Sequence, residues 1–166
     1  MERSIFAPAL VLAGSAAVVG TAVASQYLGG LEPCVLCYYQ RYPWYAVIVL
    51  MLSALALGGR VRAALLAVAA LLFVIGALMG AYHVGVEHKI FAGPAACGSV
   101  TIDAGSIDAL RAQLVGKPVV RCDRPAWSLF GVSMAGYNLL ASLGMAALAF
   151  WLARREWQAR EWKIAA

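Results

Sequence analysis

The sequence predicts an all-α integral membrane protein, a bundle of four transmembrane helices with two cysteine-bearing loops outside the membrane. Two observations lead to this prediction. The 166 residues are 63% hydrophobic and only 13% charged, and their mean hydropathy of +0.80 is far above that of soluble domains. The apolar residues also fall into four runs separated by polar segments, which fits one small bundle forming a single domain over residues 1–166.

The net charge of +5 does not indicate a nucleic-acid-binding protein. The basic residues lie beside the apolar runs and are not clustered into a patch that could line a groove. We therefore expect these charges to set the orientation of the chain in a lipid bilayer, with no nucleic acid as partner.

The first span is expected over about residues 8–28, which carry no charged side chain. At about 1.5 Å per residue this run crosses a hydrocarbon layer of about 30 Å. The basic start at Arg3 and the small residues of Ala22-Val23-Ala24 resemble a signal peptide. The apolar run exceeds the usual signal core of about 7–15 residues, so we expect this segment to be retained as a helix.

The second span is expected over about residues 42–57, after a loop over residues 29–41. This run is short for a full crossing unless residues around Cys37 belong to it, so we expect Cys34 and Cys37 to cap the helix at the membrane boundary. Cys37 and Arg41 would then lie one turn apart on the same face. A tight turn with two arginines, residues 58–62, should face the cytoplasm.

The third span is expected over residues 63–82 and the fourth over residues 127–152. The third contains Gly76 and Gly80, a spacing that lets helices approach closely. Polar residues of the fourth, such as Asn138, are expected to form hydrogen bonds across helices. The basic tail, residues 153–166, carries two tryptophans and is expected to anchor the chain at the cytoplasmic interface.

A longer polar loop is expected over residues 83–126, and it holds the other two cysteines, Cys97 and Cys122. Within it, residues 106–115 place apolar side chains on one face of a short helix. This amphipathic helix could lie flat on the membrane or pack on its own loop, and both interpretations stay open.

The positive-inside rule places both termini in the cytoplasm. Seven basic residues then lie inside and six outside, but five acidic residues share the outer side and most outer charges lie in the longer loop. All four cysteines fall outside, which suits an oxidising compartment.

The close spacing of Cys34 and Cys37 favours redox exchange over two other interpretations. A structural disulfide between them would close almost no loop and stabilise little. A zinc site would need two more ligands, and the remaining cysteines and histidines do not form a second close pair. Cys97 and Cys122 are adequately explained by a structural disulfide, worth about 3–4 kcal/mol from loop closure.

These residues resemble the family of disulfide bond formation protein B, DsbB, over nearly the whole chain. The resemblance rests on the Pro33–Arg41 segment with its Cys-Val-Leu-Cys motif, on Cys97 and Cys122, and on the segment Trp127–Asn138. Tyr82–Glu87 is also similar to a segment of some members, whereas His88 has no clear counterpart.

The resemblance implies an enzyme of the bacterial inner membrane that reoxidises a periplasmic thioredoxin-like dithiol oxidase, DsbA-like, and passes the electrons to ubiquinone or menaquinone. By position, Cys97 and Cys122 would exchange with the partner, and Cys34 and Cys37 would deliver electrons to quinone. Arg41 would lie beside the quinone ring.

Some assignments stay open. His83 could contact the quinone, shuttle a proton or simply form an interfacial hydrogen bond. The aromatic cluster of residues 38–45 could contact the quinone or form an interfacial belt. A specialised relative serving one dedicated partner is a further possibility, and the alternative from another class is a non-enzymatic scaffold or metal carrier with structural disulfides.

Overall fold

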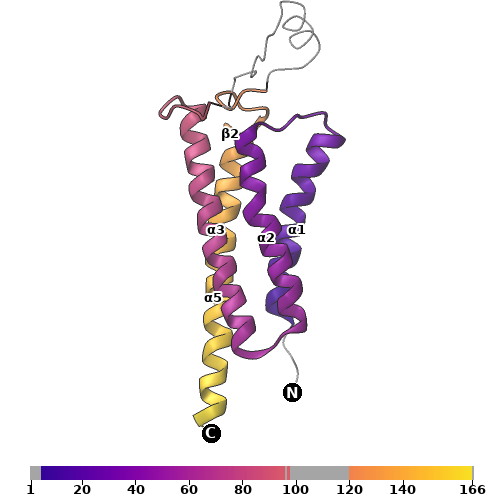
Figure 1. The fold of residues 1–166 in the computed structure, drawn as a ribbon, viewed down its shortest axis with the longest axis vertical. Helices are drawn as coiled ribbons and strands as arrows, with labels where there is room; N and C mark the ends of the chain where they lie inside the picture. The colour runs from indigo at the N-terminus through magenta and orange to yellow at the C-terminus, as the bar shows by residue number, and fades with distance from the viewer. Residues whose placement is uncertain (1–4, 96, 98–119, 166) are drawn as a thin grey trace, which may run out of the picture.

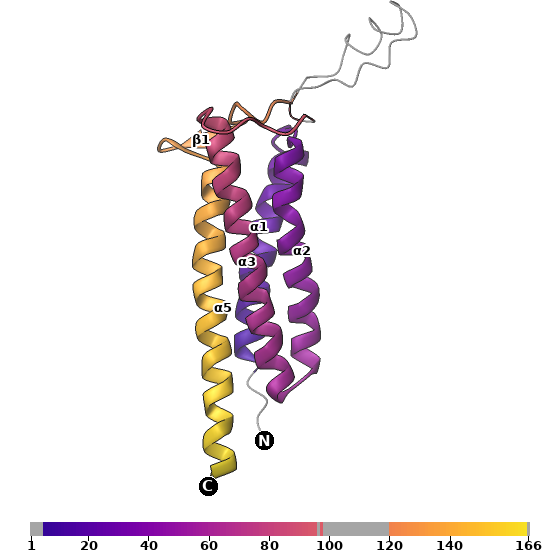
Figure 2. The same cartoon turned by 60° about the vertical axis from the view of Figure 1, so that its left-hand side comes forward.

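The computed structural model describes residues 5–95, 97 and 120–165, with side chains described as far as residue 159. This part of the chain forms four long helices and one small hairpin: α1 (Phe6–Tyr27), α2 (Val35–Ala56), α3 (Gly59–Glu87), β1 (Ser128–Leu129), β2 (Val132–Ser133) and α5 (Met134–Ala165). The helices stand side by side, with the start of α1 and the end of α5 at one end of the bundle (Figures 1 and 2). The amphipathic helix predicted at residues 106–115 lies outside the described residues.

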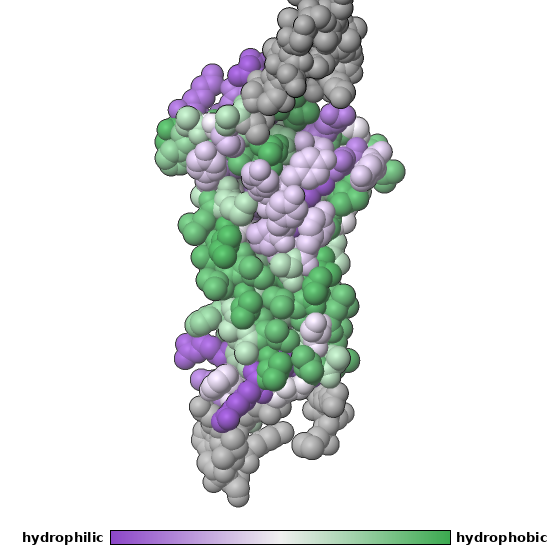
Figure 3. Space-filling view, viewed as in Figure 1, coloured by the Kyte–Doolittle hydropathy of each residue, from purple (hydrophilic) through white to green (hydrophobic). Residues whose placement is uncertain are grey.

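The prediction of a helical membrane protein is confirmed. Among the described residues, α1, α3 and the segment 134–159 of α5 are long and apolar enough to cross a membrane. Helix α2 has 22 residues, as α1 does, but its first half carries Gln40, Arg41 and several tyrosines. On the face seen in Figure 3, hydrophobic side chains cover the middle of the molecule, and more hydrophilic side chains lie above and below them.

Small residues bring α3 and α5 together, as the sequence predicts. Helix α3 packs more extensively against α5 than against any other element of the described structure. A Cβ atom added at Gly80 would lie 3.1 Å from the Cα of Leu139, and one at Gly76 would lie 3.2 Å from the Oγ of Ser142. The backbones of α3 and α5 therefore approach closely because Gly76 and Gly80 have no side chain.

Replacing Gly80 by alanine is expected to destabilise the bundle by about 1–3 kcal/mol, because the added methyl group meets backbone that cannot turn aside. Gly144→Ala is the matched control, since nothing lies within 4 Å of the corresponding Cβ. The control should be neutral, or more stable by up to about 1 kcal/mol through helix propensity. Unfolding in mixed micelles measures both, and equal stability of the two variants would contradict this packing.

The turn between α2 and α3 differs from the predicted five-residue turn. Only Leu57 and Gly58 separate the helices, so both predicted turn arginines, Arg60 and Arg62, already belong to α3. The guanidinium of Arg62 is buried and donates to the carbonyl oxygens of Ala54 (3.2 Å) and Leu57 (2.9 Å). It thereby satisfies carbonyls at the end of α2 that have no partner within the helix.

Helix α5 begins later than the predicted fourth span and continues beyond its end. Residues 128–133 form an antiparallel hairpin that pairs Ser128 with Ser133, and α5 begins only at Met134. Phe130 and Gly131 both have positive φ, 51° and 78°, as the two-residue turn of a hairpin requires. The helix then continues to Ala165 through residues predicted as a separate tail. The fold class is still all-α, because the two strands have only two residues each.

Candidate redox site

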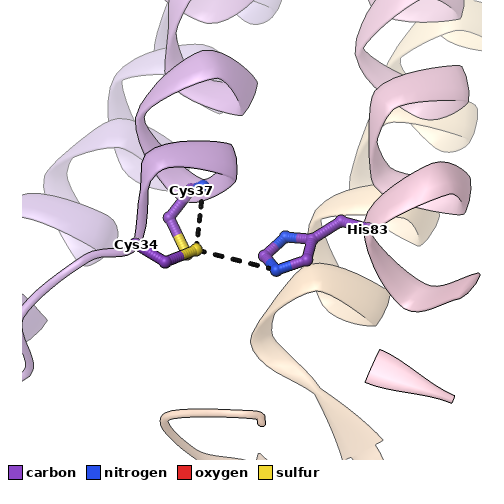
Figure 4. Close-up of side chains that lie close together, drawn as sticks. All are labelled: Cys34, Cys37 and His83. Carbon is purple, nitrogen blue, oxygen red and sulfur yellow. Dashed lines mark hydrogen bonds between the residues drawn. The ribbon is translucent and has the colours of Figure 1, made fainter. Parts of the chain in front are cut away.

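The first cysteine pair lies at the head of α2, where the prediction placed it as a cap. Cys34 is the N-cap residue, and its sulfur accepts a hydrogen bond from the backbone N–H of Cys37 at 3.2 Å. Both thiols are free, and their sulfur atoms lie 2.7 Å apart (Figure 4). A disulfide of about 2.05 Å could therefore form with little movement.

His83 faces this pair from α3. Its ring is buried, with 3% of the residue exposed, and its Nε2 atom lies 3.6 Å from the Cys34 sulfur (Figure 4). The other ring nitrogen, Nδ1, lies 2.6 Å from Nε2 of the buried Gln40. The two helices thus hold an imidazole against a thiol.

The second cysteine pair forms a disulfide, Cys97–Cys122, with the two Cα atoms 5.3 Å apart. It packs on the first pair: Cys34 and Cys122 belong to one buried cluster with Leu36 and Val86, and Cys37 and Cys97 pack against it. The structure therefore brings all four predicted cysteines together.

Arg41 lies on the same side of α2, as predicted, and shares a cleft with Cys37 and His83. Its guanidinium donates to Oε1 of Gln26 at 2.7 Å and to the carbonyl oxygen of Ala22 at 3.1 Å, both on α1. Within the described part of the chain, two of its five N–H groups are used in this way, so others remain for a ligand. The rest of the cleft is largely apolar and includes Val18, Val19, Leu31, Trp44 and Met134.

Comparison with known proteins identifies the family. The family model described as "Disulfide bond formation protein DsbB" matches residues 3–152. The chain belongs to the DsbB family. Membership implies a disulfide-generating oxidoreductase held in a membrane.

Individual relatives of this chain support the assignment to this family. Disulfide bond formation protein B of Methylococcus capsulatus is 33% identical over 152 residues, covering 84% of this chain and 90% of the relative. The protein of the same name from Saccharophagus degradans is 30% identical over 156 residues, covering 89% and 91%. An uncharacterised protein of Rickettsia prowazekii is 30% identical over 127 residues, covering 75% and 73%. No solved structure matches significantly.

A bound metal ion fits the residues of this DsbB-family site less well than a disulfide does. The sulfur atoms of Cys34 and Cys37 and a ring nitrogen of His83 lie within 4.8 Å of one another. A closed structural zinc site needs four such donors, and within the described residues this group has three. A disulfide uses the same two sulfur atoms without a further ligand.

The Cys34 thiol, which precedes α2 and lies outside the predicted spans, is poised as a thiolate. The pKa of the Cys34 thiol is lowered to about 5, chiefly by the hydrogen bond with the Cys37 sulfur; His83 contributes to the lowering, and burial opposes it. The start of α2 adds a positive dipole end beside the sulfur.

We expect the alkylation rate of Cys34 in the reduced protein to stay on its plateau at pH 7. A lowered pKa means that the thiolate dominates above that value and is lost only as the pH falls through about 5. An ordinary thiol already loses its thiolate below about pH 8.5. Iodoacetamide labelling with peptide mass spectrometry measures this profile, and a midpoint above pH 8 would contradict it.

The residues of the predicted aromatic cluster divide between the surface and the interior. The side chains of Tyr38, Tyr39, Tyr42 and Tyr45 are exposed, whereas Trp44 is buried and stacks edge-on against Phe73 at 4.9 Å. Trp44 thus belongs to the interior and not to an interfacial belt. His88 is exposed at the end of α3.

Gln40, which was not among the predicted site residues, forms hydrogen bonds with His83 and with Asn138 of α5. A polar residue within an apolar helix, three positions after Cys37 and so on the same face, was the available signal. Asn138 does form the cross-helix hydrogen bond that was predicted for it.

Proposed function

We propose that this protein oxidises a thioredoxin-like dithiol protein in the periplasm and delivers the electrons to a membrane quinone. The observation that supports this most directly is the shared cluster of the two cysteine pairs, beside a cleft that contains Arg41 and His83. Disulfide exchange requires sulfur atoms that can reach one another, and electron delivery to a lipid-soluble acceptor requires the final pair to lie near the bilayer.

The proposal includes a fourth span. Helix α2 stands within the bundle beside α1 and α3 and has a length similar to that of α1 (Figure 1). With four crossings, both termini lie on the cytoplasmic side of the bacterial inner membrane and the cysteines lie on the periplasmic side. The hydrophobic surface seen in Figure 3 supports a position across the membrane.

Electrons move in three balanced steps. The partner's two thiols reduce the Cys97–Cys122 disulfide, so the partner gains a disulfide and this pair gains two electrons and two protons. The reduced pair then opens an oxidised Cys34–Cys37 disulfide through a transient mixed disulfide between one loop cysteine and Cys34 or Cys37. The Cys34–Cys37 pair finally gives two electrons to quinone and closes its disulfide. The quinol takes up two protons, one from the Cys37 thiol and one from water, because Cys34 reacts as a thiolate.

The cleft has the donor set that a quinone needs. A quinone is a two-electron acceptor and has two carbonyl oxygens. Arg41 has N–H groups left to donate to such an oxygen, and the apolar residues of α1 and α5 cover a ring while excluding water. A cation near the site also stabilises negative charge on the Cys37 sulfur and on a reduced acceptor.

Purified protein in lipid nanodiscs tests this function. With a reduced thioredoxin-like protein as donor, quinol should form from ubiquinone or menaquinone at a rate that depends on both donor and protein. Absence of turnover with both quinones and several dithiol donors would reject the proposal while leaving the fold intact.

A further inference from the structure

A chain of hydrogen bonds crosses the bundle and ends on His83. Nε1 of Trp44 donates to Oδ1 of Asn138 at 2.9 Å, and Nδ2 of Asn138 donates to Oε1 of Gln40 at 2.6 Å. Nε2 of Gln40 lies 2.6 Å from Nδ1 of His83, whose Nε2 faces the Cys34 sulfur at 3.6 Å. The chain connects α2, α5 and α3 and reaches the reactive thiol.

The indole group fixes the direction of every bond in this chain. An indole nitrogen can only donate, so the atom of Asn138 that faces Trp44 must be the carbonyl oxygen. The amide nitrogen of Asn138 then faces Gln40, which must present its own oxygen. Gln40 is left with its NH₂ group toward Nδ1 of His83. Turning either amide around would place two donors or two acceptors against each other.

The last link decides the state of the imidazole. Nδ1 of His83 accepts a hydrogen bond and so carries no proton, which leaves the single proton of the neutral ring on Nε2. Gln40 and His83 are 5% and 3% exposed, so water cannot readily replace these bonds. The proton on Nε2 points to the Cys34 sulfur.

We propose that Trp44, Asn138 and Gln40 are positioning residues that fix His83 as its Nε2–H tautomer. In this state His83 is a hydrogen-bond donor to the Cys34 thiolate and not a base that removes its proton. The inference deepens the proposed function: when a thiolate attacks the other sulfur of a disulfide that includes Cys34, the electron pair of the broken S–S bond goes to the Cys34 sulfur, and the Nε2–H group stabilises this leaving thiolate without a proton transfer.

Other ionisable groups surround the site and remain unchanged in the test below. Cys37 and Arg41 belong to α2, and Glu32 precedes that helix and lines the same cleft. Glu87 lies about one turn beyond His83 on α3 and accepts a hydrogen bond from Ser133.

Nitrogen NMR of histidine-labelled protein tests the tautomer directly. The sequence has two histidines, and a His88→Gln variant assigns the signals. In the oxidised or reduced wild type, we expect Nε2 of His83 to carry a proton and Nδ1 to be an acceptor. A proton on Nδ1 would overturn the inference without any further variant.

Two variants test the chain. Trp44→Phe keeps an aromatic ring against Phe73 but removes the indole donor. Asn138→Leu breaks the chain of hydrogen bonds in a second place. Each should yield a mixture of tautomers and raise the midpoint pH of Cys34 alkylation. Replacing His83 by phenylalanine should raise that midpoint by about one pH unit or more, as expected for loss of a hydrogen bond to a charged group.

Trp127→Phe is the matched control, because Trp127 is partly exposed and takes no part in the chain of hydrogen bonds. It should leave both the tautomer and the alkylation midpoint unchanged. An unchanged tautomer in folded Trp44→Phe and Asn138→Leu would overturn the positioning role. The tautomer is read without quinone or partner, so its failure is distinguishable from failure of the oxidase function.

Discussion

Replacing Cys34 by serine is expected to abolish quinone reduction with every thiol donor, whereas replacing Cys122 abolishes it only with a protein donor. Cys34 belongs to the pair that delivers electrons to quinone, so no donor can bypass it. The Cys97–Cys122 pair receives electrons from a partner protein. A small dithiol reaches Cys34 and Cys37 directly and makes this second pair dispensable.

The measurement is quinol formation driven by dithiothreitol or by a reduced thioredoxin-like protein, for wild type, Cys34→Ser and Cys122→Ser. Residual activity of Cys34→Ser should be at least about a thousandfold below wild type, as for loss of a nucleophile. Thermal unfolding must show that each variant is folded. A folded Cys34→Ser variant that still turns over would favour the scaffold or metal-carrier alternative.

Replacing Arg41 by methionine is expected to raise the KM for quinone by about 10–100-fold, corresponding to loss of a hydrogen bond from a charged donor. Methionine retains much of the apolar length of the side chain but has no N–H group. Arg41→Lys should recover part of the loss, because lysine keeps the charge without the planar set of donors.

Arg41 also connects α2 to α1, and a matched variant separates this structural role from quinone binding. Gln26→Leu removes the partner of the 2.7 Å hydrogen bond but leaves the guanidinium in place. It should lower stability without raising the KM for quinone. If Gln26→Leu and Arg41→Met raise the KM equally, Arg41 acts through helix packing and does not contact the quinone.

Local spacing made parts of this site predictable from the sequence. The cap formed by Cys34 and the shared face of Cys37 and Arg41 follow from residues three or four positions apart on one helix. The close approach at Gly80 follows from small residues at a helical spacing, which favours packing without specifying the partner helix.

The rest depended on contacts between distant parts of the chain. His83 meets Cys34 across 49 positions and Gln40 meets Asn138 across 98, and no local pattern pairs such residues. The hairpin at residues 128–133 was missed because its apolar residues continue those of the following helix. The positive φ of Phe130 is unusual for a residue with a side chain, so the residue types at this turn gave only a weak signal for a turn in the sequence.

The central claim is that the Cys34–Cys37 pair gives its electrons to quinone. A single anaerobic turnover tests it: the protein is fully reduced, freed of reductant, and mixed with quinone. We predict one quinol for every two thiols lost, with the first disulfide appearing between Cys34 and Cys37 in peptide maps and the same ratio of quinol to lost thiols in Cys122→Ser. Unchanged thiols, or quinol formed without loss of the Cys34 and Cys37 thiols, would contradict the account.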